Sequence, residues 1–445
     1  MLSQPGVTGC LAQFIARTQW TDLPADVMHQ AKRSFMNFFA VALAGSQTEP
    51  VEIGLRSLAA FSGGQQVALV GRHERLDALS AAFLNAAAAN VHDFCDTHVK
   101  TVIHPTAPVA PPVLALSELK AITGRDLLLA FAVGQEVQAR IGLAISPEHY
   151  NRGWHITSTC GGFGAASAAG KLLGLEERRL VSALGIAATQ AAGLCECLGT
   201  PAKSVSVGNA ARNGLWAALL AEKGFEGPEE PLTGVQGFYN ALAGPTDLSK
   251  IVEGLGETWE LMATSYKPYP CGFVIHPALD CVLEWRRLHP DEIVTDVVVR
   301  GNPLMKLRAD RPGIESGRES QVSVQHAVAV ALITGQAGIG QFTDDCVRDE
   351  RVQALRRRVS LISDDTIPTI AAAVRITSAD GKVHELAQAA ARGSDANPLS
   401  DKDLEAKLRA AAADWNCAFD PEPLIAAVWM LDRSENVSGL VAMAT

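Results

Sequence analysis

The side chains best suited to proton transfer are concentrated between His92 and His104. The run His92-Asp93-Phe94-Cys95-Asp96-Thr97-His98 is followed by His104-Pro105, so two carboxylates and three imidazoles fall within 13 residues. Histidine titrates near neutral pH, and a neighbouring carboxylate can orient and tune it, which suits general acid–base catalysis. The same residue types can also hold a metal ion, or form only the solvated end of a helix. The residues alone leave these three interpretations open.

A second cluster is the run Tyr266-Lys267-Pro268-Tyr269-Pro270-Cys271, with His276-Pro277 after it. Its two prolines restrict the backbone around Lys267 and Tyr269, at the point where the composition of the chain changes. A lysine held in this way can bind a carboxylate or, with a lowered pKa, act as a base. The alternative is a linker that is merely stiffened by proline.

Three weaker features complete the set of candidates. Gly153-Trp154-His155 precedes Thr157-Ser158-Thr159 and the start of a predicted helix, which makes it a plausible seat for an anion. Lys203 lies shortly before another predicted helix. His326 falls in an apolar stretch, where a core histidine with a satisfied partner is the commoner explanation.

Two parts of the chain, one helical and one mixed, are predicted to position these candidates. The first 260 residues or so are dominated by alanine-rich helical patterns, which we expect to form a tightly packed bundle. The predicted helices run from Asp22 towards Gly45 and over Leu76–Val91, Pro112–Ala121, Arg125–Ile145, Phe163–Leu173, Leu180–Leu194 and Gly208–Lys223.

Beyond Tyr266 the pattern becomes mixed. Residues 294–299 are β-branched and strand-like, and residues 370–386 indicate a hairpin with a turn at Asp380-Gly381. Ser400-Asp401-Lys402-Asp403 resembles a capping box that opens a helix. The sequence therefore predicts a mainly α protein with a large all-helical domain, residues 1–265 and 399–445, and a smaller α+β lid domain, residues 266–398.

Composition narrows the possible partners and locations. The formal net charge is −10, which disfavours nucleic acid and anionic membrane surfaces as partners. The first twenty residues lack the features of a signal peptide, and no apolar run is long enough to span a bilayer. Nine cysteines occur without a CxxC pair, so neither a zinc ribbon nor a disulfide framework is indicated. We expect a cytoplasmic protein.

The glycine-rich stretch near Gly162 does not form a nucleotide site. Gly162-Phe163-Gly164 has Ser167 where a dinucleotide fingerprint needs its third glycine, and no strand precedes it. Gly170-Lys171 is followed by Leu172, which breaks the phosphate-loop pattern. Glycines that permit a tight entry into a helix explain the stretch better.

Taken together, the ordered motifs resemble the MmgE/PrpD family over nearly the whole chain. The motifs that carry the resemblance are Asp93-Phe94, Asp96-Thr97-His98, His104-Pro105-Thr106-Ala107-Pro108, Gly153-Trp154-His155, Lys203, Gly208-Asn209-Ala210-Ala211, Lys267-Pro268-Tyr269-Pro270-Cys271 and His276-Pro277. The resemblance implies a homodimer with no metal and no organic cofactor, acting on a small polycarboxylate. It implies catalytic roles for His104, Lys267, Asp93 and His155, and substrate binding by Thr97, Lys203, Tyr269 and His326.

The family includes 2-methylcitrate dehydratase, cis-aconitate decarboxylase and iminodisuccinate epimerase, which all create or quench a carbanion beside a carboxylate. Compared with the decarboxylases, this chain has Gly272 in place of a catalytic histidine, His326 in place of a tyrosine, and Cys95 in place of an aspartate common in the family. These departures favour epimerisation of iminodisuccinate, which needs only one group to take a proton and one to return it.

Other functions stay open. They are a dehydratase of the 2-methylcitrate type, a decarboxylase of the cis-aconitate type, and a non-catalytic dicarboxylate-binding protein. For the epimerase we expect His104 and Lys267 to flank the substrate α-carbon, with Asp93 holding the imidazole in its working tautomer.

The sequence thus predicts an enzyme that needs neither a metal ion nor a nucleotide, because it contains no closed set of metal ligands and no phosphate loop. We expect its activity to survive EDTA treatment and dialysis. Loss of activity with EDTA, followed by recovery with a divalent cation, would contradict this.

Overall fold

The computed structural model describes residues 6–244 and 246–445, so the first five residues of the predicted helical domain lie outside it. The chain divides into two compact units. The helical unit contains the residues up to Val91, Cys95–Thr264 and Asp401–Thr445. The mixed unit contains His92–Phe94 and Ser265–Ser400. The short segment that carries Asp93 therefore groups with residues that follow it by more than 170 positions.

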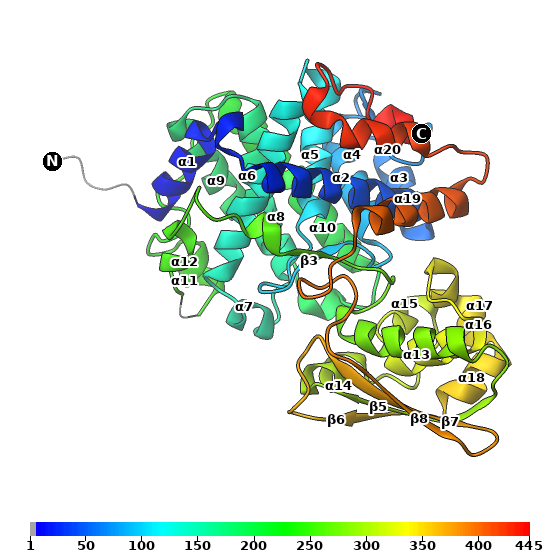
Figure 1. Cartoon of the computed structure of the whole chain (residues 1–445). Coiled ribbons are helices and arrows are strands. Elements are labelled where there is room, and N and C mark those ends of the chain that lie inside the picture. The colour runs from blue at the N-terminus through cyan, green and yellow to red at the C-terminus, as the bar shows by residue number, and fades with distance from the viewer. Residues whose placement is uncertain (1–5, 245) are drawn as a thin grey trace. The chain divides into compact units, whose positions relative to one another are not determined.

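The helical unit is built from helices of both ends of the chain (Figure 1). Helices α1 to α12 come from the N-terminal part, and α19 and α20 come from the C-terminal part. Its α-helices are α1 Val7–Arg17, α2 Ala25–Gly45, α3 Glu49–Ala59, α4 Ala78–Asn90, α5 Thr106–Leu119, α6 Gly124–Leu143, α7 Glu148–Asn151, α8 Ile156–Leu172, α9 Glu177–Ala188, α10 Ala202–Glu222, α11 Phe238–Leu242, α12 Ser249–Val252, α19 Asp401–Trp415 and α20 Glu422–Trp429. Three short strands, β1 Val67–Ala68, β2 Arg75–Leu76 and β3 Asp96–His98, interrupt them.

Helix α8 is packed on several sides by other helices, namely α5, α6, α9 and α10. Glycines make these contacts possible. A Cβ atom on Gly161 would lie 2.8 Å from the ring of Pro108 in α5, and one on Gly164 would lie 2.9 Å from the carbonyl oxygen of Gly134 in α6. The glycines of α8 therefore let neighbouring helices approach closely.

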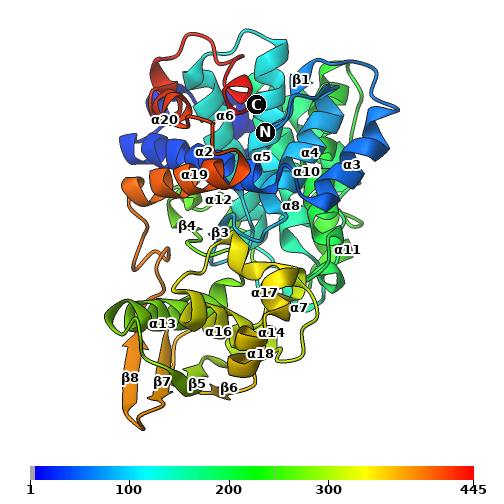
Figure 2. The same cartoon turned by 90° about the vertical axis from the view of Figure 1, so that its right-hand side faces the viewer.

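The C-terminal segment returns to the first helices. Helix α19 packs along α2, as both views show (Figures 1 and 2). Lys407 of α19 donates a hydrogen bond to Asn37 Oδ1 of α2 over 2.7 Å, and both side chains are buried. None of the helices in the described part of the chain has the length and hydrophobicity needed to cross a membrane.

The mixed unit is a four-stranded sheet with helices packed on it. Its elements are α13 His276–Leu288, β5 Val294–Gly301, α14 Pro303–Ala309, α15 Gly317–Ser320, α16 Val324–Thr334, α17 Asp344–Arg348, α18 Glu350–Arg356, β6 Val359–Ser363, β7 Ala372–Ser378 and β8 Val383–Gln388, while β4 Thr264–Tyr266 leads into it. The strand order is β6-β5-β7-β8, with β5 and β6 parallel and the other neighbours antiparallel. Buried and exposed residues alternate along β7, which is typical of a sheet with one covered face. Figure 2 shows helices on one side of the sheet.

The predicted fold class, a large helical part with a smaller α+β part, is confirmed. The strand at 294–299 and the hairpin with its turn at Gly381, where φ is +83°, are also confirmed, whereas β6 was not predicted. Three helices begin six or seven residues earlier than predicted. The predicted and observed first residues are Pro112 and Thr106, Phe163 and Ile156, and Gly208 and Ala202.

These three errors have one physical cause. Proline and glycine have low helix propensity, so the prediction started each helix at or after them. In the structure Pro111 and Pro112 lie inside α5 and are buried, and Gly161, Gly162 and Gly164 lie inside α8. Packing between helices outweighs the low propensity of these residues.

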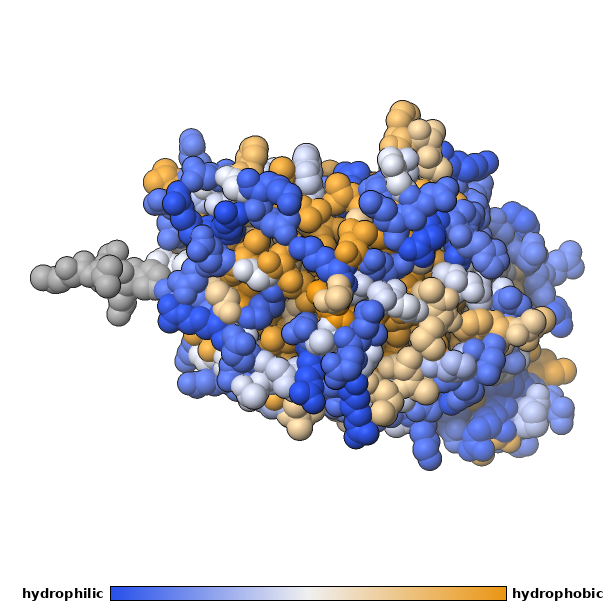
Figure 3. Space-filling view, turned by 90° about the horizontal axis from the view of Figure 1, so that it is seen from above, coloured by the Kyte–Doolittle hydropathy of each residue, from blue (hydrophilic) through white to orange (hydrophobic). Residues whose placement is uncertain are grey.

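Apolar side chains also gather on the surface of the helical unit. Figure 3 shows them on the face that includes α20 and the C-terminal segment, among hydrophilic residues. A groove of about 510 Å³ lies in this region and is lined mainly by apolar residues between Ala427 and Met443.

The contact between α8 and α10 predicts a sensitive position at Gly214. A Cβ atom there would lie 2.3 Å from the Cβ of Ala165 and 2.5 Å from the carbonyl oxygen of Gly162. Neither atom can rotate away, so Gly214→Ala should lower the free energy of unfolding by about 1–3 kcal/mol in urea titrations.

Gly162→Ala is the matched control for this experiment. It lies in the same contact, but its added Cβ would meet only the carbonyl oxygen of Ala210, at 3.9 Å. It should be neutral or stabilise the protein by up to about 1 kcal/mol, since alanine favours helix. Equal effects of the two substitutions would show that close approach does not limit this packing.

Candidate active site

Three candidate residues of the helical unit stand at the N-termini of three packed helices. His104 lies just before α5, His155 is the N-cap residue of α8, and Lys203 lies in the first turn of α10. The backbone N–H of His104 donates to Thr157 Oγ1 in the first turn of α8, over 3.0 Å. The starts of α8 and α10 are also joined by side chains, since Ser158 and Ser206 are hydrogen-bonded at 2.6 Å. Positive ends of helix dipoles therefore converge on one region.

The loop before His104 is held in a strained conformation. Of the described non-glycine residues, Asp93 and Val102 have positive φ, +52° and +54°. Aspartate tolerates this region fairly well, but for the β-branched Val102 it is a genuine outlier. The loop is held by the N–H of His98, which donates to the carbonyl of Ile103 over 2.8 Å. Such strain persists where surrounding contacts over-determine the backbone, which is common at functional sites.

The tautomer of His104 is set by a backbone carbonyl. His104 Nδ1 lies 2.8 Å from the carbonyl oxygen of Asp96 and 3.3 Å from Thr97 Oγ1. A carbonyl oxygen only accepts hydrogen bonds, so Nδ1 carries the proton and Nε2 of the neutral ring carries the lone pair. The Asp96 carbonyl thus favours this tautomer, and the Thr97 hydroxyl lies beside it. The expected role of Asp93 in holding the imidazole stays a prediction.

The carboxylate of Asp96 anchors the beginning of α5. It accepts hydrogen bonds from the hydroxyl of Thr106 and, over 3.4 Å, from the Thr106 N–H. Complete burial raises the pKa of Asp96 to about 6, although the Thr106 hydrogen bonds and the charge of Lys407 oppose this. The Asp96 side chain thus fixes the helix start, while its carbonyl fixes the imidazole.

His155 and Lys203 are both buried. The N–H of His155 donates to the carbonyl of Gly193 over 3.0 Å, and its Nδ1 lies 2.8 Å from Ser158 Oγ. Lys203 accepts a hydrogen bond at its own carbonyl from Ser206, over 2.8 Å. Its position in the first turn of α10 places a cationic residue at a helix end that already favours anions.

A partly buried ionic network supports β3, the strand that carries Thr97. Arg140 and Glu136 form an ion pair within α6, and both side chains are buried. Glu136 Oε2 accepts a hydrogen bond from the N–H of Glu260 over 2.7 Å. The Glu260 carboxylate in turn bonds His98 Nε2 at 2.9 Å, and Lys100 at 3.0 Å. Hydrogen bonds from His98 and Lys100 lower the pKa of Glu260 to about 2.

Within the mixed unit, Asp93 and Lys267 are paired. Lys267 Nζ lies 3.0 Å from Asp93 Oδ2 and donates to the Asp93 carbonyl over 2.9 Å. The structure thus joins two candidates that are 174 positions apart in the chain. Asp93 thus orients the lysine through both its carboxylate and its backbone carbonyl.

Tyr269 and His326, predicted to bind substrate, have partners inside the mixed unit. The Tyr269 hydroxyl donates to Asp280 Oδ1 over 2.7 Å, and burial raises the pKa of Tyr269 well above its ordinary value. His326 lies in α16, fully buried, with Nε2 at 2.8 Å from the carbonyl of Gln341. Burial lowers its pKa to about 4, so the ring is neutral at pH 7. Substrate binding by these two residues stays a prediction.

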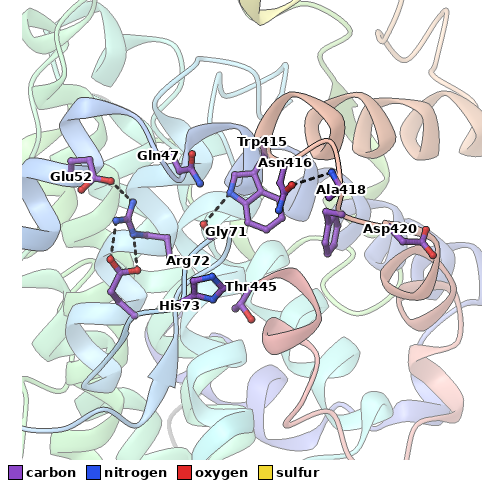
Figure 4. Close-up of a pocket in the computed structure, with 12 residues that line it drawn as sticks. Gln47, Glu52, Gly71, Arg72, His73, Trp415, Asn416, Ala418, Asp420 and Thr445 are labelled. Carbon is purple, nitrogen blue, oxygen red and sulfur yellow. Dashed lines mark hydrogen bonds and ion pairs between the residues drawn. The ribbon is translucent and has the colours of Figure 1, made fainter.

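A surface pocket of about 690 Å³ on the helical unit contains none of the candidate residues (Figure 4). Arg72 in this pocket is already paired with Glu52 and Glu74, and the indole of Trp415 donates to the carbonyl of Gly71. Its charged groups are therefore poorly placed to bind an anion. Among residues 6–244 and 246–445, no group of three or more His, Cys, Asp or Glu side chains could hold a metal ion.

Thr157 and Ser158 belong to the stretch that the sequence indicated as a possible anion seat. Ser206, Glu136 and Glu260 were not singled out from the sequence. Nothing local distinguishes Glu260, because its partners lie far away in the sequence.

The chain matches known proteins along most of its length. Residues 9–250 match the MmgE/PrpD N-terminal domain and residues 269–418 match the MmgE/PrpD C-terminal domain. Cis-aconitate decarboxylase of Mus musculus is 30% identical over 461 residues, which cover 98% of this chain and 93% of that protein. Cis-aconitate decarboxylase of Aspergillus terreus is 30% identical over 386 residues, 80% of this chain and 78% of that protein. The Homo sapiens protein of that name is 29% identical over 439 residues, 94% of this chain and 90% of its own.

The Glu260 network predicts a pH-dependent contribution to stability. The pKa of Glu260 falls from 4.5 to about 2 on folding, so its contribution is complete above about pH 4.5 and is lost as the pH falls towards 2. Glu260→Gln should lower the free energy of unfolding by about 2 kcal/mol at pH 7 and by much less at pH 3. Urea titrations at several pH values would measure this.

Glu257→Gln is the control, because Glu257 is an exposed glutamate of the same segment. It should leave stability unchanged at each pH. A loss for Glu260→Gln that is as large at pH 3 as at pH 7 would contradict the ionic origin of the effect.

Proposed function

Because this chain belongs to the MmgE/PrpD family, we propose that it catalyses proton transfer at a carbon atom beside a carboxylate of a small polycarboxylic acid. The observation that carries this proposal is the convergence of three helix N-termini, which bring His104, His155 and Lys203 to one region. Such a region combines groups that attract anions with groups that transfer protons.

The helix ends and Lys203 account for the attraction of a polycarboxylate. The first N–H groups of a helix and its dipole favour a carboxylate, and a lysine adds a full positive charge. Removal of a proton beside a carboxylate moves additional negative charge onto the carboxylate oxygens. Cationic groups and dipoles placed there beforehand stabilise that charge in the transition state. This local arrangement overcomes the unfavourable net charge of −10.

His104 is the group best prepared to remove the proton. Its Nδ1 proton is held by the Asp96 carbonyl at 2.8 Å, so Nε2 is the basic atom. Lys267 is paired with Asp93 at 3.0 Å, and an ammonium group oriented in this way is suited to return a proton or to bind a carboxylate. The two residues belong to different units, and experiment must establish whether they act on the same carbon.

Two reactions are compatible with this chemistry. Epimerisation, as of iminodisuccinate, needs only removal and return of one proton. It is favoured by Gly272, which stands where the decarboxylases carry a catalytic histidine. A lyase reaction is the second candidate and is favoured by the relatives at 29–30% identity, which are named cis-aconitate decarboxylases. Dehydration of a substrate of the 2-methylcitrate type would use the same carbanion.

A panel of di- and tricarboxylates, followed by NMR in deuterated water, tests the proposal directly. Proton exchange or epimerisation, loss of water and loss of carbon dioxide each give a distinct spectrum. We expect at least α-proton exchange with one member of the panel. Tight binding of a dicarboxylate without exchange, dehydration or decarboxylation would show a binding protein instead.

For an epimerase, His104→Gln and Lys267→Ala should fail in different ways. Loss of a positioned acid or base costs about 10² to 10⁴ in rate, so each variant should lose epimerisation. If the two groups act on opposite faces of the carbon, each variant should still exchange the α-proton of one enantiomer, and not the same one. NMR of each enantiomer in deuterated water would measure this.

His73→Gln and Lys402→Ala are suitable controls, because both side chains are exposed and neither is a candidate residue. They should keep full activity. Full turnover by both test variants, or loss of exchange with both enantiomers in both, would contradict the two-base assignment. A one-base elimination would then explain the activity better.

A further inference from the structure

His155 belongs to a hydrogen-bonded cluster with two serines. Its Nδ1 lies 2.8 Å from Ser158 Oγ and 3.1 Å from Ser206 Oγ. The two hydroxyl oxygens lie 2.6 Å apart, and Ser206 Oγ lies 2.8 Å from the carbonyl oxygen of Lys203. The cluster therefore links the N-cap residue of α8 to the first turns of α8 and α10.

The protons of this cluster can be assigned by counting donors. The Lys203 carbonyl only accepts, so the single proton of Ser206 points to it. The short contact between the two serines then needs the proton of Ser158. Neither hydroxyl proton remains for His155 Nδ1, so Nδ1 must donate to the serine oxygens. The neutral ring consequently carries its lone pair on Nε2.

The backbone around the cluster is shaped to allow it. Gly193 has φ +130°, a conformation that favours glycine. A Cβ atom on Gly193 would lie 2.7 Å from the Cβ of Ser158 and 3.4 Å from the Cβ of Ser206. The same glycine accepts a hydrogen bond at its carbonyl from the N–H of His155, over 3.0 Å. The loop at Gly193 thus packs closely against both serines and holds the histidine backbone.

We propose that Ser158 and Ser206 are positioning residues that fix His155 in its Nδ1-protonated tautomer, so that Nε2 is the atom that exchanges protons with the substrate. The role of His155 in turnover rests on the proposed function, whereas its tautomer is a property of the resting protein. His104 and His155 then present the same nitrogen, Nε2, as their basic atom. One tautomer is set by a carbonyl and the other by two hydroxyls.

The tautomer can be read by long-range ¹H–¹⁵N NMR on protein labelled at histidine, with the His155 signals assigned from His155→Gln. In the wild-type protein at a pH where the ring is neutral, we expect the proton on Nδ1. In Ser158→Ala combined with Ser206→Ala, the ring should shift towards the Nε2-protonated form that imidazole prefers in water.

Kinetics supply the second measurement, with a substrate identified by the polycarboxylate panel. The double variant should lower kcat by about 10-fold to 100-fold, by analogy with the loss of hydrogen-bond partners that orient metal-bound histidines, with a much smaller change in KM. Its pH–rate profile should also shift. The single variant Ser206→Thr retains a hydroxyl at this position. Unlike the double variant, it should keep both the wild-type tautomer and most of the activity.

Ser167→Ala is the matched control. Ser167 is also a buried serine of α8, but its hydroxyl bonds only the carbonyl of Phe163 in its own helix, over 2.8 Å. It should change neither the tautomer nor kcat.

Two results would overturn the inference. They are a proton on Nε2 of His155 in the wild-type protein, and a double variant that keeps both the tautomer and kcat. The test is separable from that of the proposed function. If no polycarboxylate reacts, the proposed function fails, while the NMR of the resting protein still decides the role of the two serines.

Discussion

The close approach of helices around α8 is the constraint on which the candidate site depends. Gly161 and Gly164 allow α5 and α6 to pack closely against α8, and Gly214 allows α8 to pack closely against α10. Because the backbones come so close, the first turns of α5, α8 and α10 are near enough for direct hydrogen bonds between Thr157 and the His104 backbone, and between Ser158 and Ser206. Each helix by itself contributes one candidate side chain and one helix N-terminus. Together they place two imidazoles and a lysine at a common positive region.

Neutral groups determine which ring nitrogen carries the proton in His104 and in His155. A carbonyl holds His104, and two hydroxyls hold His155. A carboxylate in either place would stabilise the imidazolium and would also repel an anionic substrate. The carboxylates of the helical unit are used structurally instead. Asp96 anchors a helix start, and Glu260 ties down the strand that carries Thr97. Asp93, in the mixed unit, is paired with Lys267.

The relation to the cis-aconitate decarboxylases is close enough to define the family but leaves the reaction to experiment. The chain has histidines and lysines in the motifs by which it resembles the family. At Gly272 a side chain is absent although the backbone leaves room, since an added Cβ would meet no heavy atom closer than 3.7 Å. His326 is neutral and bonded to a backbone carbonyl within its own core. These two positions are where a difference in reaction from the named relatives would be expected.

By itself, the sequence determined the fold class, most helices, three of the four strands in the mixed sheet, and the residues that could transfer protons. Periodicity, turn residues and clusters of His, Asp and Lys are local signals, and each was read within a short window. It did not determine where α5, α8 and α10 begin, because buried prolines and glycines are tolerated there only through contacts with other helices. Nor could it show that Asp93 pairs with Lys267, or that Asp96 and two serines set the histidine tautomers. Those contacts join residues up to 174 positions apart, or depend on a backbone carbonyl that every residue has, so only tertiary packing could select them.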